Sequence, residues 1–388
     1  MIKLYEKALL PAGFSANGLA CGLKKSGKPD LALIYSKLPA FASACFTANK
    51  IKAAPILLTQ EHLKKTKTHR AIIVNSGNAN CFTGAKGRAV SEETAQIFAD
   101  ELGIRKESVL VNSTGIIGKQ LPVNKIKKAA GSLVRGLSEK GINKASRAIM
   151  TTDTFLKEVT ADIKIGNTTV RVCGIAKGAG MIAPDLATML AFITTDASIT
   201  RRALDKALKE AVARSFNCIT VDGCMSTNDT VIVLANAASQ NALIDMKPIG
   251  RAGKESRDFI LFCECLQLVC LELAKMIIRD AEGATKFIRI HVKNARNYSD
   301  ARKAALAIAN SNLFKTAMYG CNPNFGRVAA SVGASGVAVT ERGLKIKLGP
   351  LHKKNIDLEV NLSTGSAEAT IYTSDLSPEY VKINAAYS

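Results

Sequence analysis

Residues 174–193 read GIAKGAGMIAPDLATMLAFI, and this segment decides how the rest of the chain is interpreted. Its glycines and its proline predict a loop of restricted, side-chain-poor backbone. The apolar run Met189–Ile193 follows at once and predicts a buried strand, so Thr188 stands where the loop meets the strand. By itself this pattern fits a surface turn before a core strand. A phosphate-binding loop is disfavoured because G-x-x-x-x-G-K-[ST] and the strand–loop–helix order are missing.

Further strands are predicted on both sides of this segment. The β-branched runs 71–74 and 108–111 each lead into a Gly-bearing loop, and residues 73–77 resemble residues 110–114. Alternating apolar and polar residues in 344–348 and 356–362 predict half-exposed antiparallel strands.

Helices are predicted between these strands. Ser91, followed by two glutamates, predicts a helix that runs to Leu102 and stops at Gly103. Thr200 opens a second helix, and residues 256–281 predict a long third one. Alternation of strands and helices indicates an α/β or α+β chain rather than a helical bundle.

Length and composition bound the possible functions. With 388 residues the chain exceeds the size of most single cores, so two substructures or one large α/β layer are expected. Hydrophobic residues at 47% and charged residues at 22% exclude a disordered or collagen-like chain. A net charge of +21 suggests a polyanionic partner or an acidic substrate. Scattered basic residues and only 5% aromatic residues disfavour nucleic acid.

The cysteine, histidine and hydropathy patterns bear on metal binding, cellular compartment and membrane insertion. The ten cysteines contain no Cys-x-x-Cys pair and the four histidines lie far from them in sequence, which disfavours a structural zinc site and favours reduced thiols in a cytosolic protein. The charged N-terminus lacks the apolar core of a signal peptide. The most apolar stretch, 259–274, is too short to span a membrane. We therefore expect a cytoplasmic protein without a metal or membrane partner.

Residues 177–191 follow the pattern K-G-x-G-M-I-A-P-x-x-A-T-M-L-A, which resembles the signature of the ornithine acetyltransferases, also called glutamate N-acetyltransferases, of arginine biosynthesis. Further motifs in that family's order extend over nearly the whole chain: NSGNAN at 75–80, NSTGIIG at 112–118, MTTDT at 150–154, STNDT at 226–230, EGATK at 282–286, NPNFGR at 322–327 and INA at 383–385. The resemblance implies a layered α/β sandwich of the self-cleaving ornithine acetyltransferase type, with a smaller C-terminal α/β part.

The resemblance also implies self-cleavage between Ala187 and Thr188, which would give chains 1–187 and 188–388. Thr188 would then be an N-terminal nucleophile. Its hydroxyl needs a base, and the freed α-amino group, with a pKa of about 7.7–8.0, is partly unprotonated near neutral pH. Before cleavage the same hydroxyl can attack the carbonyl group of Ala187 in an acyl shift.

Other roles follow from the same resemblance. Thr114 and Gly115, expected in a loop after a strand, would form the oxyanion hole. Substrate would contact Thr151, Lys177, Thr188, Glu282, Asn384 and Ser388. A solvated surface position remains the alternative interpretation for Lys177. Glu282 is expected to be the last residue of a helix. Because the helix dipole disfavours a carboxylate at that end, a functional role for Glu282 is favoured.

The implied substrates are N-acetylornithine as acetyl donor and glutamate as acceptor, with no metal or organic cofactor and with acetyl-CoA open as a second donor. The implied assembly is a heterotetramer with two copies of each cleaved chain. Three departures from the family pattern bear on substrate affinity and identity. Cys224-Met225 stand where the family motif has Asp-Thr, Asn322 stands where it has Asp, and the usual end N-A-x-Y-T-T reads N-A-A-Y-S, with Ser388 as its last residue. Two other readings stay open, an N-terminal-nucleophile aminopeptidase or amidase on a related fold and a non-catalytic basic binding protein.

Overall fold

The computed structural model describes residues 2–183, 189–246 and 256–386, which form two compact units. The N-terminal unit comprises residues 1–178, 185–216 and 226–273, and the C-terminal unit comprises 179–184, 217–225 and 274–388. Each unit therefore contains residues from both sides of the expected cut. The compact units are not the two expected chains.

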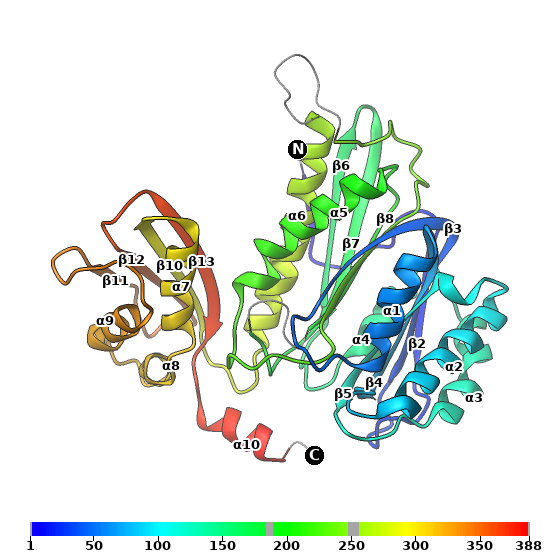
Figure 1. Cartoon of the computed structure of the whole chain (residues 1–388), viewed down its shortest axis with the longest axis horizontal. Helices are drawn as coiled ribbons and strands as arrows, with labels where there is room; N and C mark the ends of the chain where they lie inside the picture. Colours follow the sequence, from blue (N-terminus) through cyan, green and yellow to red (C-terminus); the bar gives the residue numbers. More distant parts are fainter. Residues whose placement is uncertain (1, 184–188, 247–255, 387–388) are drawn as a thin grey trace. The chain divides into compact units, whose positions relative to one another are not determined.

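The N-terminal unit is built on a mixed sheet that has nine strands among the described residues (Figure 1). Its order is β1-β6-β7-β8-β9-β3-β4-β5, with β2 paired to β3. The pairs β4–β5 and β8–β9 are parallel, whereas the other neighbours are antiparallel. The strands are β1 (Lys3–Tyr5), β2 (Phe14–Leu19), β3 (Leu31–Phe46), β4 (Thr68–Asn78), β5 (Val109–Ile116), β6 (Lys157–Ile165), β7 (Thr168–Lys177), β8 (Leu190–Thr195) and β9 (Thr230–Ala235).

Helices cover both faces of this sheet because alternate strand residues point to opposite sides. On one face, Leu31 and Leu33 share a core with α1, α2 and α3, and on the other face Ala32 and Ile34 share a core with α4. The expected layered α/β sandwich is confirmed. The helices are α1 (Ala54–Lys65), α2 (Gly84–Leu102), α3 (Val123–Arg135), α4 (Ile142–Ile149), α5 (Arg201–Ala213) and α6 (Arg257–Arg279), with short 3₁₀ turns at Lys106–Ser108 and Phe216–Cys218.

The C-terminal unit is a smaller α/β part, as expected. Its sheet has the order β11-β12-β10-β13, and α7 packs against β10 and β13. Ile290, Ile308 and Phe314 lie in its fully buried core. The elements are β10 (Phe287–Ala295), α7 (Tyr298–Ala309), α8 (Asn312–Tyr319), α9 (Phe325–Ala334), β11 (Lys345–Leu348), β12 (Asn355–Asn361), β13 (Ala367–Ser374) and α10 (Pro378–Ala386).

The helix boundaries test the predicted capping residues. Thr200 caps α5, because its hydroxyl accepts the N–H of Ala203 at 3.3 Å, and Gly103 ends α2 with φ of +62°. The predicted start of that helix at Ser91 is wrong, since α2 already begins at Gly84. The Ser91 hydroxyl donates to the carbonyl oxygen of Gly87 one turn earlier, so it lies inside the helix.

The strand predictions need two corrections. Thr114 and Gly115 do not lie in a loop after β5 but in its last residues, because parallel pairing with β4 continues to Gly77. A Cβ atom on Gly115 would lie 2.4 Å from the carbonyl carbon of Gly77, so only glycine permits this pairing. The strand predicted at 356–362 is antiparallel only to β11, and it pairs with β10 in parallel.

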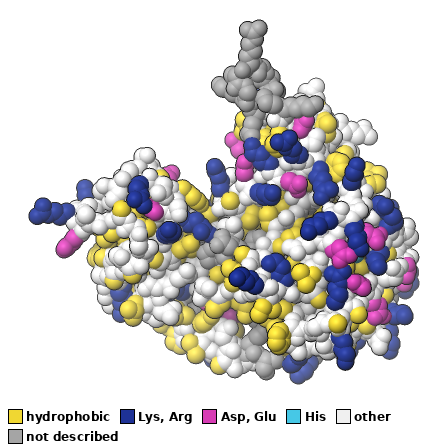
Figure 2. Space-filling view, in the orientation of Figure 1, with side chains coloured by type: hydrophobic (Ala, Val, Ile, Leu, Met, Phe, Trp, Pro, Cys, Tyr) yellow, Lys and Arg dark blue, Asp and Glu magenta, His cyan; other side chains and the backbone are white. Residues whose placement is uncertain are grey.

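The surface and the thiols agree with the composition. Figure 2 shows Lys and Arg side chains spread among other types over the visible face, without a single basic patch. All ten cysteines lie among the described residues, and none of them forms a disulfide bond there; Cys224 and Cys321 are exposed. Among the described residues, no helix is long and apolar enough to cross a membrane.

Candidate active site

Lys177 is the last residue of β7, and its side chain is enclosed in the N-terminal unit, with only 3% of the residue exposed. Its Nζ atom donates to the hydroxyl oxygen of Thr114 over 3.4 Å. The alternative of a solvated surface lysine is therefore wrong. A hydroxyl group that accepts from an ammonium group keeps its own hydrogen for another acceptor.

The carboxylate of Asp153 lies at the centre of this region. It accepts hydrogen bonds from the Lys157 Nζ atom at 2.7 Å, from the Gly178 N–H at 2.7 Å and from the Thr151 N–H at 2.9 Å. Burial alone would raise the pKa of Asp153, but the charges of Lys177 and Lys157 hold it below the usual value. Asp153 thus links Thr151 to the segment that begins at Lys177.

A third cation faces the same region. The Nζ atom of Lys24 donates to the carbonyl oxygens of Pro29 and Met150, each at 2.7 Å. The pKa of Lys24 is lowered to about 8, mainly by burial and also by the nearby charge of Lys177, while Asp30 and Asp153 oppose the change. The charges of Lys24, Lys157 and Lys177 all act on the carboxylate of Asp153 or are acted on by it. The buried ammonium group of Lys177 suits a substrate that carries a carboxylate of its own.

The expected oxyanion donors sit on a strand that is braced by side chains. The hydroxyl of Ser113 donates to Asn75 Oδ1 at 2.6 Å, across the parallel β4–β5 pair. Gly115 has φ of +133°, which turns the backbone at the end of β5 into a conformation that side chains disfavour. A fixed backbone is what an oxyanion site requires, because its donors must not reorganise during the reaction.

Glu282 and Asn384 contact each other within the C-terminal unit. The Asn384 Nδ2 atom donates to Glu282 Oε2 at 2.9 Å, and the Glu282 N–H donates to the carbonyl oxygen of Ala179. A Cβ atom on Gly180 would lie 2.2 Å from Glu282 Oε2, so the absence of a side chain there makes room for the carboxylate. The expectation that Glu282 closes a helix is wrong, because α6 already ends at Arg279.

The motif that departs from the family pattern lies in the same unit. The carboxylate of Asp222 accepts from the Met181 N–H at 2.7 Å, from the Cys224 N–H at 3.0 Å and from the Tyr380 hydroxyl at 3.0 Å. Burial and this carboxylate raise the pKa of Tyr380. Asp222 therefore binds the backbone of Cys224, the Tyr380 hydroxyl of α10 and the segment 179–183 at Met181.

The expected site residues thus fall into two described groups. In the N-terminal unit Thr151 and Lys177 interact with Asp153, and Lys177 also contacts Thr114. In the C-terminal unit Glu282 accepts a hydrogen bond from Asn384. Ala187, Thr188 and Ser388 lie outside the described residues. The sequence patterns identify the motif MTTDT at 150–154 but give no role to its aspartate, Asp153. The presence of one charged residue in an otherwise hydroxyl-rich motif could have indicated a role for Asp153. No sequence pattern indicated a role for Lys24.

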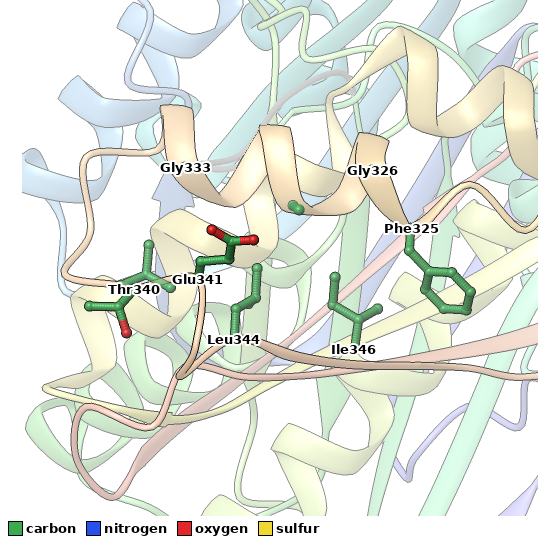
Figure 3. A pocket seen from close by; sticks show the side chains of 9 residues that line it. Phe325, Gly326, Gly333, Thr340, Glu341, Leu344 and Ile346 are labelled. Carbon is green, nitrogen blue, oxygen red and sulfur yellow. The ribbon is translucent and has the colours of Figure 1, made fainter.

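A pocket elsewhere in the C-terminal unit contains none of these residues. It lies between α9 and β11, and Figure 3 shows Phe325, Leu344 and Ile346 on its walls. Its lining is mostly apolar, with Glu341 and Thr340 at one end. Phe325 is half-exposed there, so this motif residue marks a surface groove of the unit and not the polar groups described above.

Comparison with known proteins identifies the family. The sequence profile described as the ArgJ family matches residues 15–353 and 349–388. The arginine biosynthesis bifunctional protein ArgJ of Geobacter sulfurreducens is 44% identical over 396 residues, covering 97% of this chain and 98% of that protein. The protein of the same name from Caldanaerobacter subterraneus subsp. tengcongensis is also 44% identical, over 98% of each chain.

A crystal structure of ornithine acetyltransferase from Mycobacterium tuberculosis, complexed with ornithine, is 39% identical with a TM-score of 0.45; it covers 48% of this chain and 100% of that one. The family match and the full-length relatives decide between the readings that the sequence left open, in favour of the transferase over the amidase and the binding protein. The chain belongs to the ArgJ family and is an acetyltransferase of arginine biosynthesis.

Proposed function

We propose that this chain cleaves itself between Ala187 and Thr188 and then moves the acetyl group of N-acetylornithine to glutamate through an acetyl ester on Thr188. The products of cleavage are the chains 1–187 and 188–388, which we expect to assemble as two copies of each in the cytoplasm. The observation that carries the proposal is the contact between Lys177 and Thr114, a buried cation beside a hydroxyl that keeps its hydrogen for an oxyanion.

Cleavage begins when the Thr188 Oγ atom attacks the carbonyl carbon of Ala187. The C–N bond breaks, the Thr188 nitrogen takes the hydroxyl proton, and water then hydrolyses the ester to leave a carboxylate on Ala187. Strands β7 and β8 are paired on the two sides of this bond, with Lys177 opposite Leu190. The two chains therefore stay in one sheet after the peptide bond is broken.

Transfer uses the same hydroxyl twice. The freed α-amino group of Thr188 takes the hydroxyl proton while Oγ attacks the acetyl carbonyl carbon, and the proton passes to the leaving nitrogen of ornithine. The neutral α-amino group of glutamate then attacks the acetyl carbonyl carbon of the ester, the bond from that carbon to Oγ breaks, and a proton from the attacking nitrogen passes through the Thr188 amino group to Oγ. In both steps the Thr114 hydroxyl and the Gly115 N–H donate to the oxyanion, which stabilises it in place of water.

The remaining expected residues bind substrate. The cations around Lys177 offer a partner for the α-carboxylate that both substrates carry, with Thr151 held beside them by Asp153. We assign the polar end of the ornithine side chain to Glu282 and Asn384, and a further contact to Ser388. No metal or organic cofactor takes part in these steps.

Intact-mass spectrometry tests the proposal. The purified protein should give two fragments that meet at Ala187 and Thr188, and N-acetylornithine should add one acetyl group to the fragment that starts at Thr188. Glutamate should remove that group. Thr188→Ala should stay uncut and inactive, whereas Thr188→Ser, which keeps a hydroxyl, is the matched control and should still be cut.

Three results would contradict the proposal: an uncut wild-type chain with full activity, a cleaved Thr188→Ala variant, or acetylation of the other fragment. Release of acetate at a rate that glutamate does not change would favour the amidase instead. Acetyl-CoA in place of N-acetylornithine tests the second donor by the same mass increase.

A further inference from the structure

The motif Ser226–Thr230 leads directly into β9 at the centre of the large sheet, but the proposed steps of cleavage and transfer do not use it. Its third and fourth residues, Asn228 and Asp229, are buried with 6% and 1% exposure. Both make hydrogen bonds to backbone atoms of other segments of the N-terminal unit, and these segments carry the expected catalytic groups.

Asn228 reaches the strand of the oxyanion donors. Its Nδ2 atom donates to the carbonyl oxygen of Ser113 at 2.8 Å and to that of Ala79 at 2.7 Å. The carbonyl of Ser113 and the N–H of Thr114 belong to one planar peptide group. Asn228 therefore fixes the orientation of the peptide group that enters Thr114.

Asp229 contacts the residue that follows the expected nucleophile. Its Oδ1 atom accepts the N–H of Met189 at 2.8 Å, and the neighbouring Thr230 N–H donates to the carbonyl oxygen of Met189 at 3.2 Å. Met189 follows Thr188 directly in the chain. The residue after the expected nucleophile is thus held at both of its backbone polar groups.

The carboxyl group of Asp229 has spare hydrogen-bonding capacity. Its Oδ2 atom is enclosed and makes no well-formed hydrogen bond among the residues that the structure describes, although the hydroxyls of Ser226 and Thr47 lie close enough to the carboxyl group to favour its charged form. Burial raises the pKa of Asp229 well above the usual value, although the Met189 N–H, the charge of Lys177 and the hydroxyls of Ser226 and Thr47 oppose the rise. Burying a carboxyl oxygen without a good hydrogen bond costs free energy. A carboxyl group whose only task was to bind the Met189 N–H would therefore be disfavoured at position 229.

We propose that Asn228 and Asp229 are positioning residues that hold the two sides of the acetyl-transfer site in register, Asn228 through the Ser113–Thr114 peptide and Asp229 through Met189. This inference rests on the proposed function, since it assumes the roles of Thr114 and Thr188. Neither side chain is required to touch substrate. Both act through backbone groups, at a point where small displacements change rates strongly.

The test compares Asp229→Asn, Asp229→Ala and Asn228→Ala in the full-length protein. Asp196→Asn is the matched control, because Asp196 is a buried carboxyl group just after the other end of β8, where it accepts the N–H groups of Arg171 at 2.9 Å and Ala12 at 3.2 Å. The readouts are the rate of chain cleavage by intact mass, kcat and KM with N-acetylornithine and glutamate, and the melting temperature.

We expect Asp229→Ala and Asn228→Ala to lower both the cleavage rate and kcat by about 10- to 100-fold with KM unchanged, as misplaced reacting groups do. Asp229→Asn keeps an oxygen for Met189 and should fall between Asp229→Ala and the wild type. Asp196→Asn should leave cleavage and kcat unchanged even if it melts earlier.

Wild-type cleavage and kcat in Asp229→Ala and Asn228→Ala would overturn the inference, as would an equal loss of both in Asp196→Asn. A wild-type chain that is uncut, or acetylated elsewhere than on Thr188, would overturn the proposed function instead. The two failures are therefore told apart by the wild-type protein alone. If one variant does not fold, the other still tests its own side of the site.

Discussion

Replacing Asp153 by asparagine should destabilise the protein strongly, because it removes the carboxylate from a fully buried ion pair. Both side chains of the Asp153–Lys157 pair are 0% exposed, and their charged atoms are 2.7 Å apart. At that separation an effective dielectric constant of about 20 gives an attraction of about 6 kcal/mol. The desolvation of two ions offsets most of it, but removing one partner leaves the other charge buried, at a cost of about 3–5 kcal/mol.

Calorimetric melting of Asp153→Asn in the Thr188→Ala background, which we expect to remain one chain, measures this loss. With a shift of about 2–4 °C per kcal/mol, the variant should melt about 6–20 °C earlier than its parent. The double variant Asp153→Asn/Lys157→Met should recover part of the loss, because it no longer buries the ammonium group of Lys157. A shift of less than about 2 °C, or a double variant less stable than the single one, would refute the reasoning.

The same ion pair predicts a pH dependence. The pKa of Asp153 is lower in the folded protein than in the unfolded chain, so its stabilising contribution is complete above the unfolded pKa of about 4 and is lost as the pH falls through the folded value. The difference in melting temperature between the parent and Asp153→Asn should therefore be constant from neutral pH down to about 5 and shrink only in stronger acid. A difference that disappears between pH 6 and 8 would assign the effect to another group.

Three further variants test the site. Thr114→Val should lower kcat by about 10²- to 10³-fold with little change in KM, since it removes one oxyanion donor; unchanged kcat would exclude that role. Lys177→Ala should weaken binding of both carboxylate substrates by about 1.5–3 kcal/mol, measured as KM against an exposed Lys25→Ala control, and equal kinetics would contradict it. Gly180→Ala places a Cβ atom 2.2 Å from Glu282 Oε2 and should raise KM for N-acetylornithine, whereas Gly333→Ala, where a Cβ meets nothing within 4 Å, should not.

Local sequence patterns correctly predicted the features that depend on only a few neighbouring residues. Thr200 and Gly103 end their helices as expected because capping depends on adjacent backbone groups. The start of α2 was predicted too late, because Ser91 can serve equally as a cap or bond back inside a helix. The place of Thr114 in a strand depended on pairing with Ser76 of β4, which lies far away in the sequence.

The sequence by itself determined the family, through motifs in a fixed order, and with it the layered α/β fold, the acetyl transfer and the candidate residues. Only the tertiary structure decided that Lys177 is buried beside Thr114, that Asp153 binds Thr151 and Lys157, and that Asn228 and Asp229 bind the backbone of Ser113 and Met189. The physical reason is that burial and charge pairing are long-range properties. A lysine looks the same in sequence whether it is solvated or enclosed, and its neighbours are chosen by the order of strands in the sheet.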